Sequence, residues 1–118
     1  MQRGAELAQR YSYDEARRYR EMAREFQRIR AARPYVNQCV VARDLGARAF
    51  GISVDHLLAG TREADVTAIR QKLMAFTHVM TGLSFRQIAT VFDRDHSAVG
   101  YACNKYERAI RAAVADRG

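Results

Sequence analysis

Residues 94–99, which read Arg-Asp-His-Ser-Ala-Val, decide how this chain is interpreted. Asp95 belongs to the residue types that cap the N-terminus of a helix. After it, Val99, Cys103, Tyr106 and Ile110 follow one another at intervals of three or four residues, the spacing of one helical face. The pattern predicts a helix over 95–112 whose first turn carries charged and hydroxyl side chains.

A shorter amphipathic helix is predicted directly upstream, over 84–92. Ser84 and Gln87 have the spacing of a capping box, and Phe92 ends the apolar pattern before a tight polar turn. Two short helices joined in this way form a helix-turn-helix, which presents the start of its second helix to the major groove of DNA. The sequence therefore predicts a DNA-binding motif at 84–92 and 95–112.

The middle of the chain is also expected to be helical. An apolar stripe from Val66 to Met80 predicts a long support helix over 65–81, which Gly82 ends. Asn37 is a suitable cap for a helix over about 38–50, and a short turn is expected at 54–58. These elements would support the motif.

The N-terminal region forms a further predicted helix. Ser12 and Glu15 match a capping box, so an amphipathic helix is expected over 12–33, ended by Pro34, with residues 1–11 frayed. It is a packed support element, a DNA-backbone contact, or a face for a homodimer or a protein partner. The fold class is thus all-α, with an N-terminal helical extension at 1–36 and a DNA-binding domain at 37–118.

Composition points to a polyanionic partner. The net charge is +7, the pI is about 10.0, and 18 of the 20 basic residues are arginine, which suits bidentate contacts to phosphate and guanine. A solvated basic surface is the alternative reading of the same charge.

The two cysteines, Cys39 and Cys103, are expected to be reduced and buried. No cofactor, metal site, membrane span or signal peptide is predicted, so a cytoplasmic protein is expected.

The start of the second motif helix carries groups that can read base edges. Histidine, serine and asparagine side chains donate or accept hydrogen bonds, Asp95 can accept from a cytosine amine, and Ala98 can touch a thymine methyl. Gly100 in mid-helix costs about 1 kcal/mol relative to alanine, which a close approach of DNA or of another helix would explain. A catalytic role is rejected, because Asp95 and His96 are adjacent on a helix start and diverge.

Residues 47–110 resemble the C-terminal DNA-binding domain, domain IV, of the bacterial replication initiator DnaA. Four blocks carry the resemblance in the right order: Phe-Gly-Ile-Ser-Val-Asp-His-Leu-Leu at 50–58, Arg-Gln-Lys-Leu-Met-Ala-Phe at 70–76, Thr-Gly-Leu-Ser-Phe-Arg-Gln-Ile-Ala at 81–89, and residues 94–99 with Ala102, Cys103 and Lys105 after them. No phosphate-binding GxxxxGK[ST] motif occurs in the sequence, so no ATPase module is expected.

The resemblance implies an origin-box type of recognition. It implies base readout by Asp95, His96 and Ser97 in the major groove and by Arg70 in the minor groove. Phosphate contacts are expected from five hydroxyl or basic residues: Ser84, Arg86, Arg94, Lys105 and Arg108. Three features depart from the family pattern and leave the target sequence open: Phe92-Asp93 in place of two glycines, an acidic residue on either side of Ala64 in the basic loop, and Ala98 in place of a hydroxyl.

The function expected from the sequence is sequence-specific binding of double-stranded DNA. The protein would act as a stand-alone regulator of transcription or replication, without ATPase activity. We expect it in the bacterial nucleoid, encoded by a chromosome or a phage. The alternative is a protein-interaction module that keeps the fold but binds a protein instead of DNA. Whether the protein is a monomer or a dimer depends on the N-terminal helix and is left open.

Overall fold

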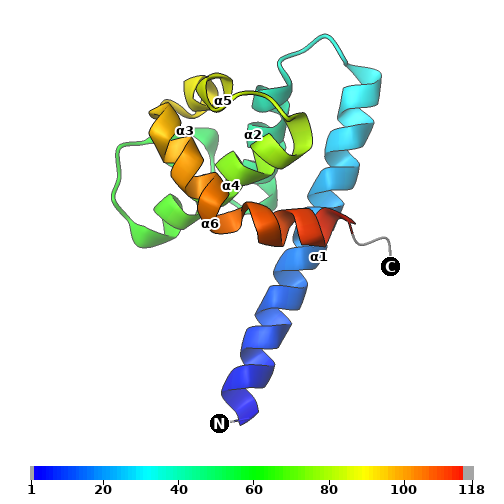
Figure 1. Ribbon diagram of the computed structural model, residues 1–118, viewed down its shortest axis with the longest axis vertical. Helices are drawn as coiled ribbons and strands as arrows, with labels where there is room; N and C mark the ends of the chain where they lie inside the picture. Colours follow the sequence, from blue (N-terminus) through cyan, green and yellow to red (C-terminus); the bar gives the residue numbers. More distant parts are fainter. Residues whose placement is uncertain (1, 116–118) are drawn as a thin grey trace.

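The computed structural model describes residues 2–115, with side chains from residue 14 onward, and over this range the chain forms six α-helices and no strand (Figure 1). The all-α fold class is confirmed. In chain order the helices are α1 (Gln2–Ala32), α2 (Gln38–Ala49), α3 (Val54–Leu58), α4 (Ala64–Thr81), α5 (Phe85–Phe92) and α6 (His96–Ala115).

The predicted helix-turn-helix is present as α5 and α6. Ser84 and Gln87 form the expected capping box: the Ser84 hydroxyl accepts from the Gln87 amide at 3.2 Å, and the Gln87 side chain accepts from the Ser84 amide at 3.1 Å. Gly82 takes the left-handed conformation that ends α4, with φ of 65°. These short-range signals place the three helices within a few residues of their predicted bounds.

The turn between α5 and α6 depends on Asp93. Its φ is 53°, and it is the one non-glycine residue with a positive φ among those described. Aspartate tolerates the left-handed region better than most residues, so the chain makes this turn without a glycine. The Asp93 amide donates back to Thr90, and the Arg94 amide donates to Ala89 at 3.1 Å. The turn is thereby closed onto the end of α5.

Helix α1 begins earlier than predicted. It starts at Gln2 rather than after Ser12, so the expectations of a cap at Ser12 and of frayed residues 1–11 are wrong. Serine is only mildly unfavourable inside a helix, and no proline precedes it, so a capping-box pattern does not by itself stop a helix from starting upstream. The Ser12 side chain lies outside the described side chains. The other end is as predicted, since α1 stops at Ala32, shortly before Pro34.

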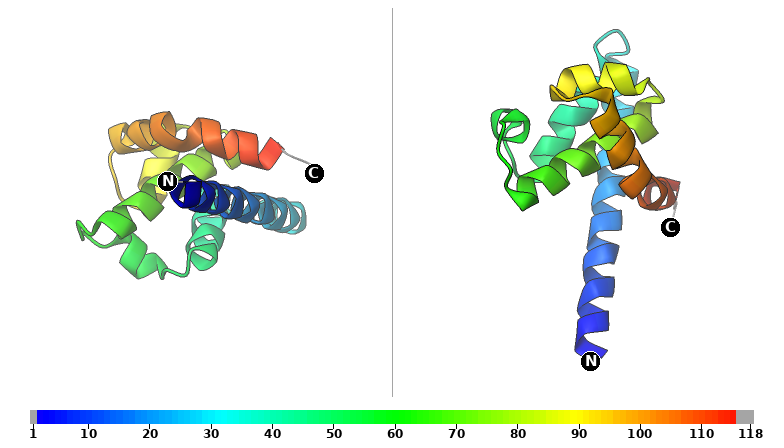
Figure 2. Two further views of the ribbon diagram at one scale, coloured as in Figure 1. Left: turned by 90° about the horizontal axis from the view of Figure 1, so that it is seen from below. Right: turned by 60° about the vertical axis from the view of Figure 1, so that its left-hand side comes forward.

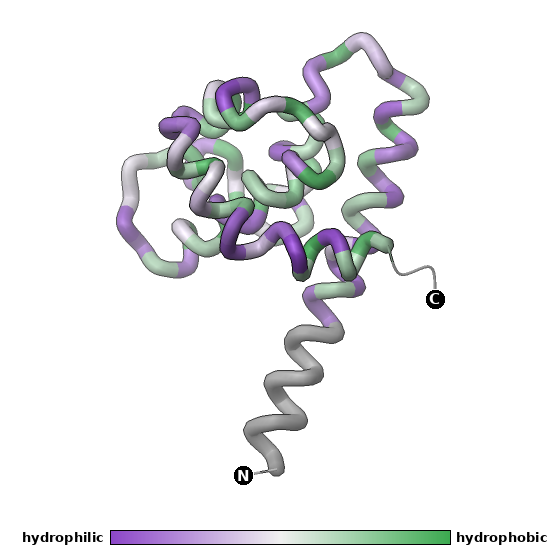
Figure 3. Tube along the Cα trace, in the orientation of Figure 1, coloured by the Kyte–Doolittle hydropathy of each residue, from purple (hydrophilic) through white to green (hydrophobic). Residues whose placement is uncertain are grey.

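One core joins α1 to the rest of the molecule. Helix α4 packs against every other helix, and the C-terminal part of α6 lies beside α1 (Figures 1 and 2). Tyr19, Met22 and Phe26 of α1 are buried in the same cluster as the apolar residues of α2, α4, α5 and α6. From residue 14 onward, α1 therefore packs against the core, and apolar and polar residues alternate along this part of the helix (Figure 3).

A polar contact also fastens α1 to α4. The Lys72 ammonium lies 2.6 Å from the Glu15 carboxylate, which in turn accepts from the Tyr19 hydroxyl at 3.1 Å. Burial and the neighbouring Glu15 charge raise the pKa of Tyr19, so its hydroxyl stays protonated and available as a donor. This polar contact fixes how α1 is oriented on α4, which apolar packing alone does not specify.

The two cysteines are buried, as predicted. Burial raises the pKa of the Cys39 thiol, and burial together with Glu107 raises that of Cys103 to about 11. Both thiols are thus held in their unreactive protonated form at neutral pH. None of the helices between residues 2 and 115 is long and apolar enough to cross a membrane.

Candidate nucleic-acid interface

The exposed first turn of α6 is the centre of the candidate site. Asp95 immediately precedes the helix, and its carbonyl accepts from the amides of Ala98 at 3.0 Å and Val99 at 3.4 Å. The side chains of Asp95, His96 and Ser97 are all exposed. Within residues 14–115 the Asp95 carboxylate has no hydrogen-bond partner. The expectation that the Asp95 side chain caps this helix is therefore wrong: Asp95 starts the helix with its backbone carbonyl and leaves its carboxylate free for a ligand.

The opposite side of α6 fixes the helix in the core. Its buried residues are Val99, Ala102, Cys103, Ile110 and Ala113. Residues 97, 101, 104 and 108 lie four, three and four positions apart, so they share the face that points directly away from this core. All four are exposed. The helix thus presents one continuous exposed stripe that begins at its first turn, which is the arrangement a helix needs to enter the major groove.

A shallow depression joins α5 to the start of α6. It is lined by Arg86, Ala89, Thr90, Asp93, Arg94, Asp95 and His96. Arg86 is exposed near the N-terminus of α5, where unpaired backbone amides favour phosphate. Ser84, also exposed, uses its hydroxyl in the cap, accepting from the Gln87 amide and donating to the Gln87 side chain at 3.0 Å. The depression brings a cation beside the exposed first turn of α6.

The expected phosphate ligand Arg94 is engaged within the protein. Its guanidinium donates to the Ala59 carbonyl at 2.9 Å and to the Asp93 carbonyl at 2.8 Å, with a longer contact to Leu58 at 3.5 Å. Arg94 therefore bridges the turn of the helix-turn-helix to the C-terminal end of α3. Most of its donors are taken up by backbone carbonyls.

Arg70, expected in the minor groove, is buried. It is 6% exposed, and its Nε donates to the Leu57 carbonyl at 2.8 Å while Nη2 donates to Ala59 at 3.2 Å. Burial, and then the nearby charge of Arg94, lower the pKa of Arg70. The structure does not present this side chain for a base contact. The physical reason is its register, four residues after Val66 and three before Leu73, both of them core positions of α4.

Arg70 and Arg94 together form what we call the arginine brace, two guanidinium groups on the carbonyls of residues 57–59. The last carbonyls of a helix lack partners within the helix, and α3 has only five residues. The brace supplies those partners and so ties the carbonyls of residues 57–59 to α4 and to the turn before α6. Arg62 follows in the loop between α3 and α4, and its side chain is exposed.

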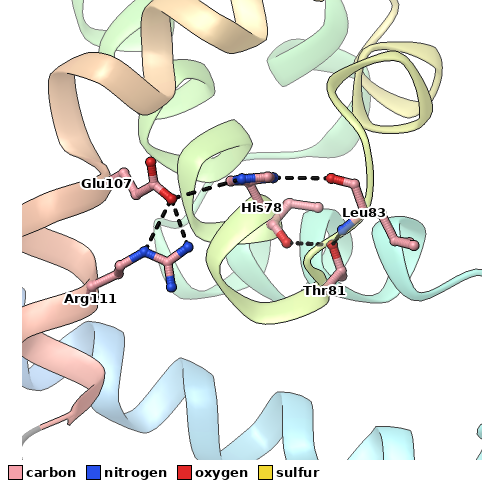
Figure 4. A network of polar contacts seen from close by, with 6 residues as sticks. His78, Thr81, Leu83, Glu107 and Arg111 are labelled. Atoms are coloured by element: carbon pink, nitrogen blue, oxygen red, sulfur yellow. Dashed lines mark hydrogen bonds and ion pairs between the residues drawn. The ribbon is translucent and has the colours of Figure 1, made fainter.

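A second polar network fixes where α5 begins (Figure 4). His78 of α4 is hydrogen-bonded through Nδ1 to the Leu83 carbonyl at 3.0 Å, and its Nε2 lies 3.8 Å from Glu107 of α6. Arg111 donates to the same Glu107 carboxylate at 2.7 and 3.1 Å, and Thr81 accepts from the Leu83 amide at 3.1 Å. The connection from α4 to α5 is thereby tied to α6.

Further along α6, two predicted phosphate ligands remain exposed. Lys105 lies over the Tyr106 ring at 5.4 Å, and Arg108 follows on the outward stripe. Neither forms an ion pair with any residue that the structure describes. A Cβ at Gly100 would lie 3.5 Å from the Phe85 ring of α5, an ordinary van der Waals contact, so the packing of α5 on α6 does not require a glycine there.

Comparisons with known proteins agree with this geometry. Residues 43–105 match the family model described as the bacterial dnaA protein helix-turn-helix. The chain is also 33% identical over 72 residues to the chromosomal replication initiator protein DnaA of Synechococcus sp. (strain JA-2-3B'a(2-13)). That match covers 60% of this chain and 15% of the relative, so the chain spans a small part of the relative's length. No solved structure matches the chain.

Proposed function

The chain belongs to the bacterial DnaA helix-turn-helix family, and from this premise we propose that it binds double-stranded DNA sequence-specifically through the first turns of α6. The observation that supports this most strongly is the exposed first turn of a helix whose other face is locked in the core. Asp95, His96 and Ser97 place an acceptor, an imidazole and a hydroxyl there. These groups can distinguish base pairs by their hydrogen-bonding edges.

Phosphate contacts in this proposal come from exposed cations around that turn. Arg86 lies near the start of α5, and Lys105 and Arg108 lie farther along α6. Ser84 completes the N-terminus of α5, whose unpaired amides favour a phosphate. We assign Arg70 and Arg94 to holding the loop in place instead, because their guanidinium groups already donate to carbonyls. Such contacts set affinity and register, while the first turn of α6 sets sequence preference.

The biological role we propose is regulation of replication or transcription at a bound DNA site, by binding rather than catalysis. The family and the relative's name support a replication context in the bacterial nucleoid. A stand-alone regulator without ATPase activity is part of this proposal. A homodimer would require a palindromic site, whereas a monomer would select an asymmetric one.

Selection from a random duplex pool tests the proposal. We expect enrichment of one sequence motif, bound with a dissociation constant that rises steeply with salt because phosphate contacts release counterions. The symmetry of the motif reports whether one or two copies bind. Absence of an enriched motif, with no binding to random duplex tighter than about 10⁻⁴ M at low salt, would contradict the proposal and favour a protein partner.

A further inference from the structure

An aromatic side chain stands in the middle of the outward stripe of α6. Tyr101 is 60% exposed, and it is one of three large exposed hydrophobic residues among those described, with Tyr35 and Phe85. Single exposed aromatic residues are common on protein surfaces and need no explanation by themselves. The position of Tyr101 is what makes it informative, because Ser97 precedes it by four residues and Asn104 follows it by three.

The register of α6 points Tyr101 directly away from the core. Val99, Ala102 and Cys103 face inward, so position 101 lies near the centre of the opposite face. Tyr101 is about 6 Å farther along the helix axis than Ser97, at a rise of 1.5 Å per residue. When the first turn of α6 enters a groove about 12 Å wide, a side chain at this position faces the base pairs, whereas Lys105 points toward the groove wall.

The Phe85 ring lies on another side of α6, next to Gly100. A Cβ at Gly100 would lie 3.5 Å from this ring. Phe85 is held there by an edge contact with the His78 ring, at a centroid distance of 5.0 Å. The start of α5 therefore fixes one side of α6 at this level and leaves the phenol ring of Tyr101 uncovered.

We propose that Tyr101 selects a thymine in the bound site by contact of its ring with the 5-methyl group. Thymine is the base that presents a methyl group in the major groove, and apolar side chains recognise it there. This inference rests on the proposed function, because it assumes that α6 enters the major groove. Position 101 then adds apolar readout to the polar readout of the first turn.

The test replaces each thymine of the selected site in turn by deoxyuridine, which removes only the methyl group. Wild type and Tyr101→Phe should lose about four-fold in affinity at one thymine, the equivalent of roughly 0.8 kcal/mol for one buried methylene-sized group. Tyr101→Ala should bind thymine and deoxyuridine equally at that position. Tyr35→Ala removes a tyrosine that is 81% exposed outside α5 and α6, and it should keep the wild-type profile.

Two results would overturn the inference while leaving the proposed function intact. One is a selected site at which Tyr101→Ala keeps the full deoxyuridine penalty. The other is a wild-type profile without any deoxyuridine penalty, with Tyr101→Phe as weak as Tyr101→Ala on every sequence, which would assign the hydroxyl to a phosphate. Failure to select any site would overturn the inference and the proposed function together.

Discussion

Two groups of basic side chains surround the helix-turn-helix, and they differ in what they contact. The arginine brace, Arg70 and Arg94, donates to backbone carbonyls at the end of α3. Lys105 and Arg108 on α6 are exposed and form no ion pair with the described residues. All four carry the same charge, so the difference teaches that charge near a DNA-binding motif does not identify a DNA contact. Backbone carbonyls that lack a partner can accept hydrogen bonds from an arginine and so make it unavailable to DNA.

Helix α3 explains why the brace is needed. It is a helix of five residues, so most of its C-terminal carbonyls have no partner within the helix. An arginine side chain offers five donors in a fixed fork, and two such forks can satisfy several carbonyls at once. The end of α3 is thereby tied to α4 and to the turn of the helix-turn-helix. Lys105 and Arg108, by contrast, stay exposed on α6.

The largest effect is expected from Arg70→Met. It should lower the free energy of unfolding by about 1–3 kcal/mol, because the Leu57 and Ala59 carbonyls lose buried charged donors. Urea titration of the purified variant measures this. Arg86→Met removes an exposed arginine as a matched control and should change stability by less than about 0.5 kcal/mol. An Arg70→Met protein of unchanged stability, whose slope of log K against log salt falls by about 0.9, would instead assign Arg70 to a phosphate.

Arg94→Met should have a smaller effect on stability, about 1 kcal/mol, since this side chain is only half-buried. Its main consequence is expected in the loop over 59–63, whose backbone amides should exchange with solvent faster when one half of the brace is gone. Hydrogen exchange measured by mass spectrometry reports this. If the exchange rates of residues 59–63 are unchanged, Arg94 does not hold this loop and the prediction is contradicted.

The smallest effect on stability is expected at the exposed cations. Lys105→Ala and Arg108→Ala should leave the free energy of unfolding within about 0.5 kcal/mol of wild type. Each should weaken binding to all duplexes alike and reduce the slope of log K against log salt by about 0.9. Arg48→Ala, an exposed arginine at the end of α2, is the control that should leave the slope unchanged. If affinity falls for only one DNA sequence, Lys105 and Arg108 contact bases and not phosphates.

Local signals made much of the fold predictable. Three signals each mark a helix end, and the structure has all of them: side-chain caps by Ser84 with Gln87 and by Asn37, and the left-handed backbone of Gly82. The start of α1 was not predictable from Ser12, because a capping pattern competes with continuation of the helix and nothing upstream stops it. A capping pattern predicts the start of a helix only where a residue upstream, such as proline or glycine, interrupts the helix.

The roles of the two brace arginines depended on tertiary structure. The spacing of Val66, Arg70 and Leu73 already placed Arg70 on the core face of α4, and that signal could have outweighed the family resemblance. For Arg94 no local signal existed, because its acceptor Ala59 lies 35 residues away in the chain. The exposed first turn of α6, by contrast, followed directly from the apolar spacing after Asp95.

The central claim is that the first turn of α6 reads sequence, and His96→Ala tests it most directly. Binding of wild type and variant is compared on the selected site and on random duplex of the same length, with His56→Ala as a second exposed histidine outside α5 and α6. The account predicts a loss of about 1–3 kcal/mol on the selected site and almost none on random duplex. An equal loss on both duplexes would contradict it.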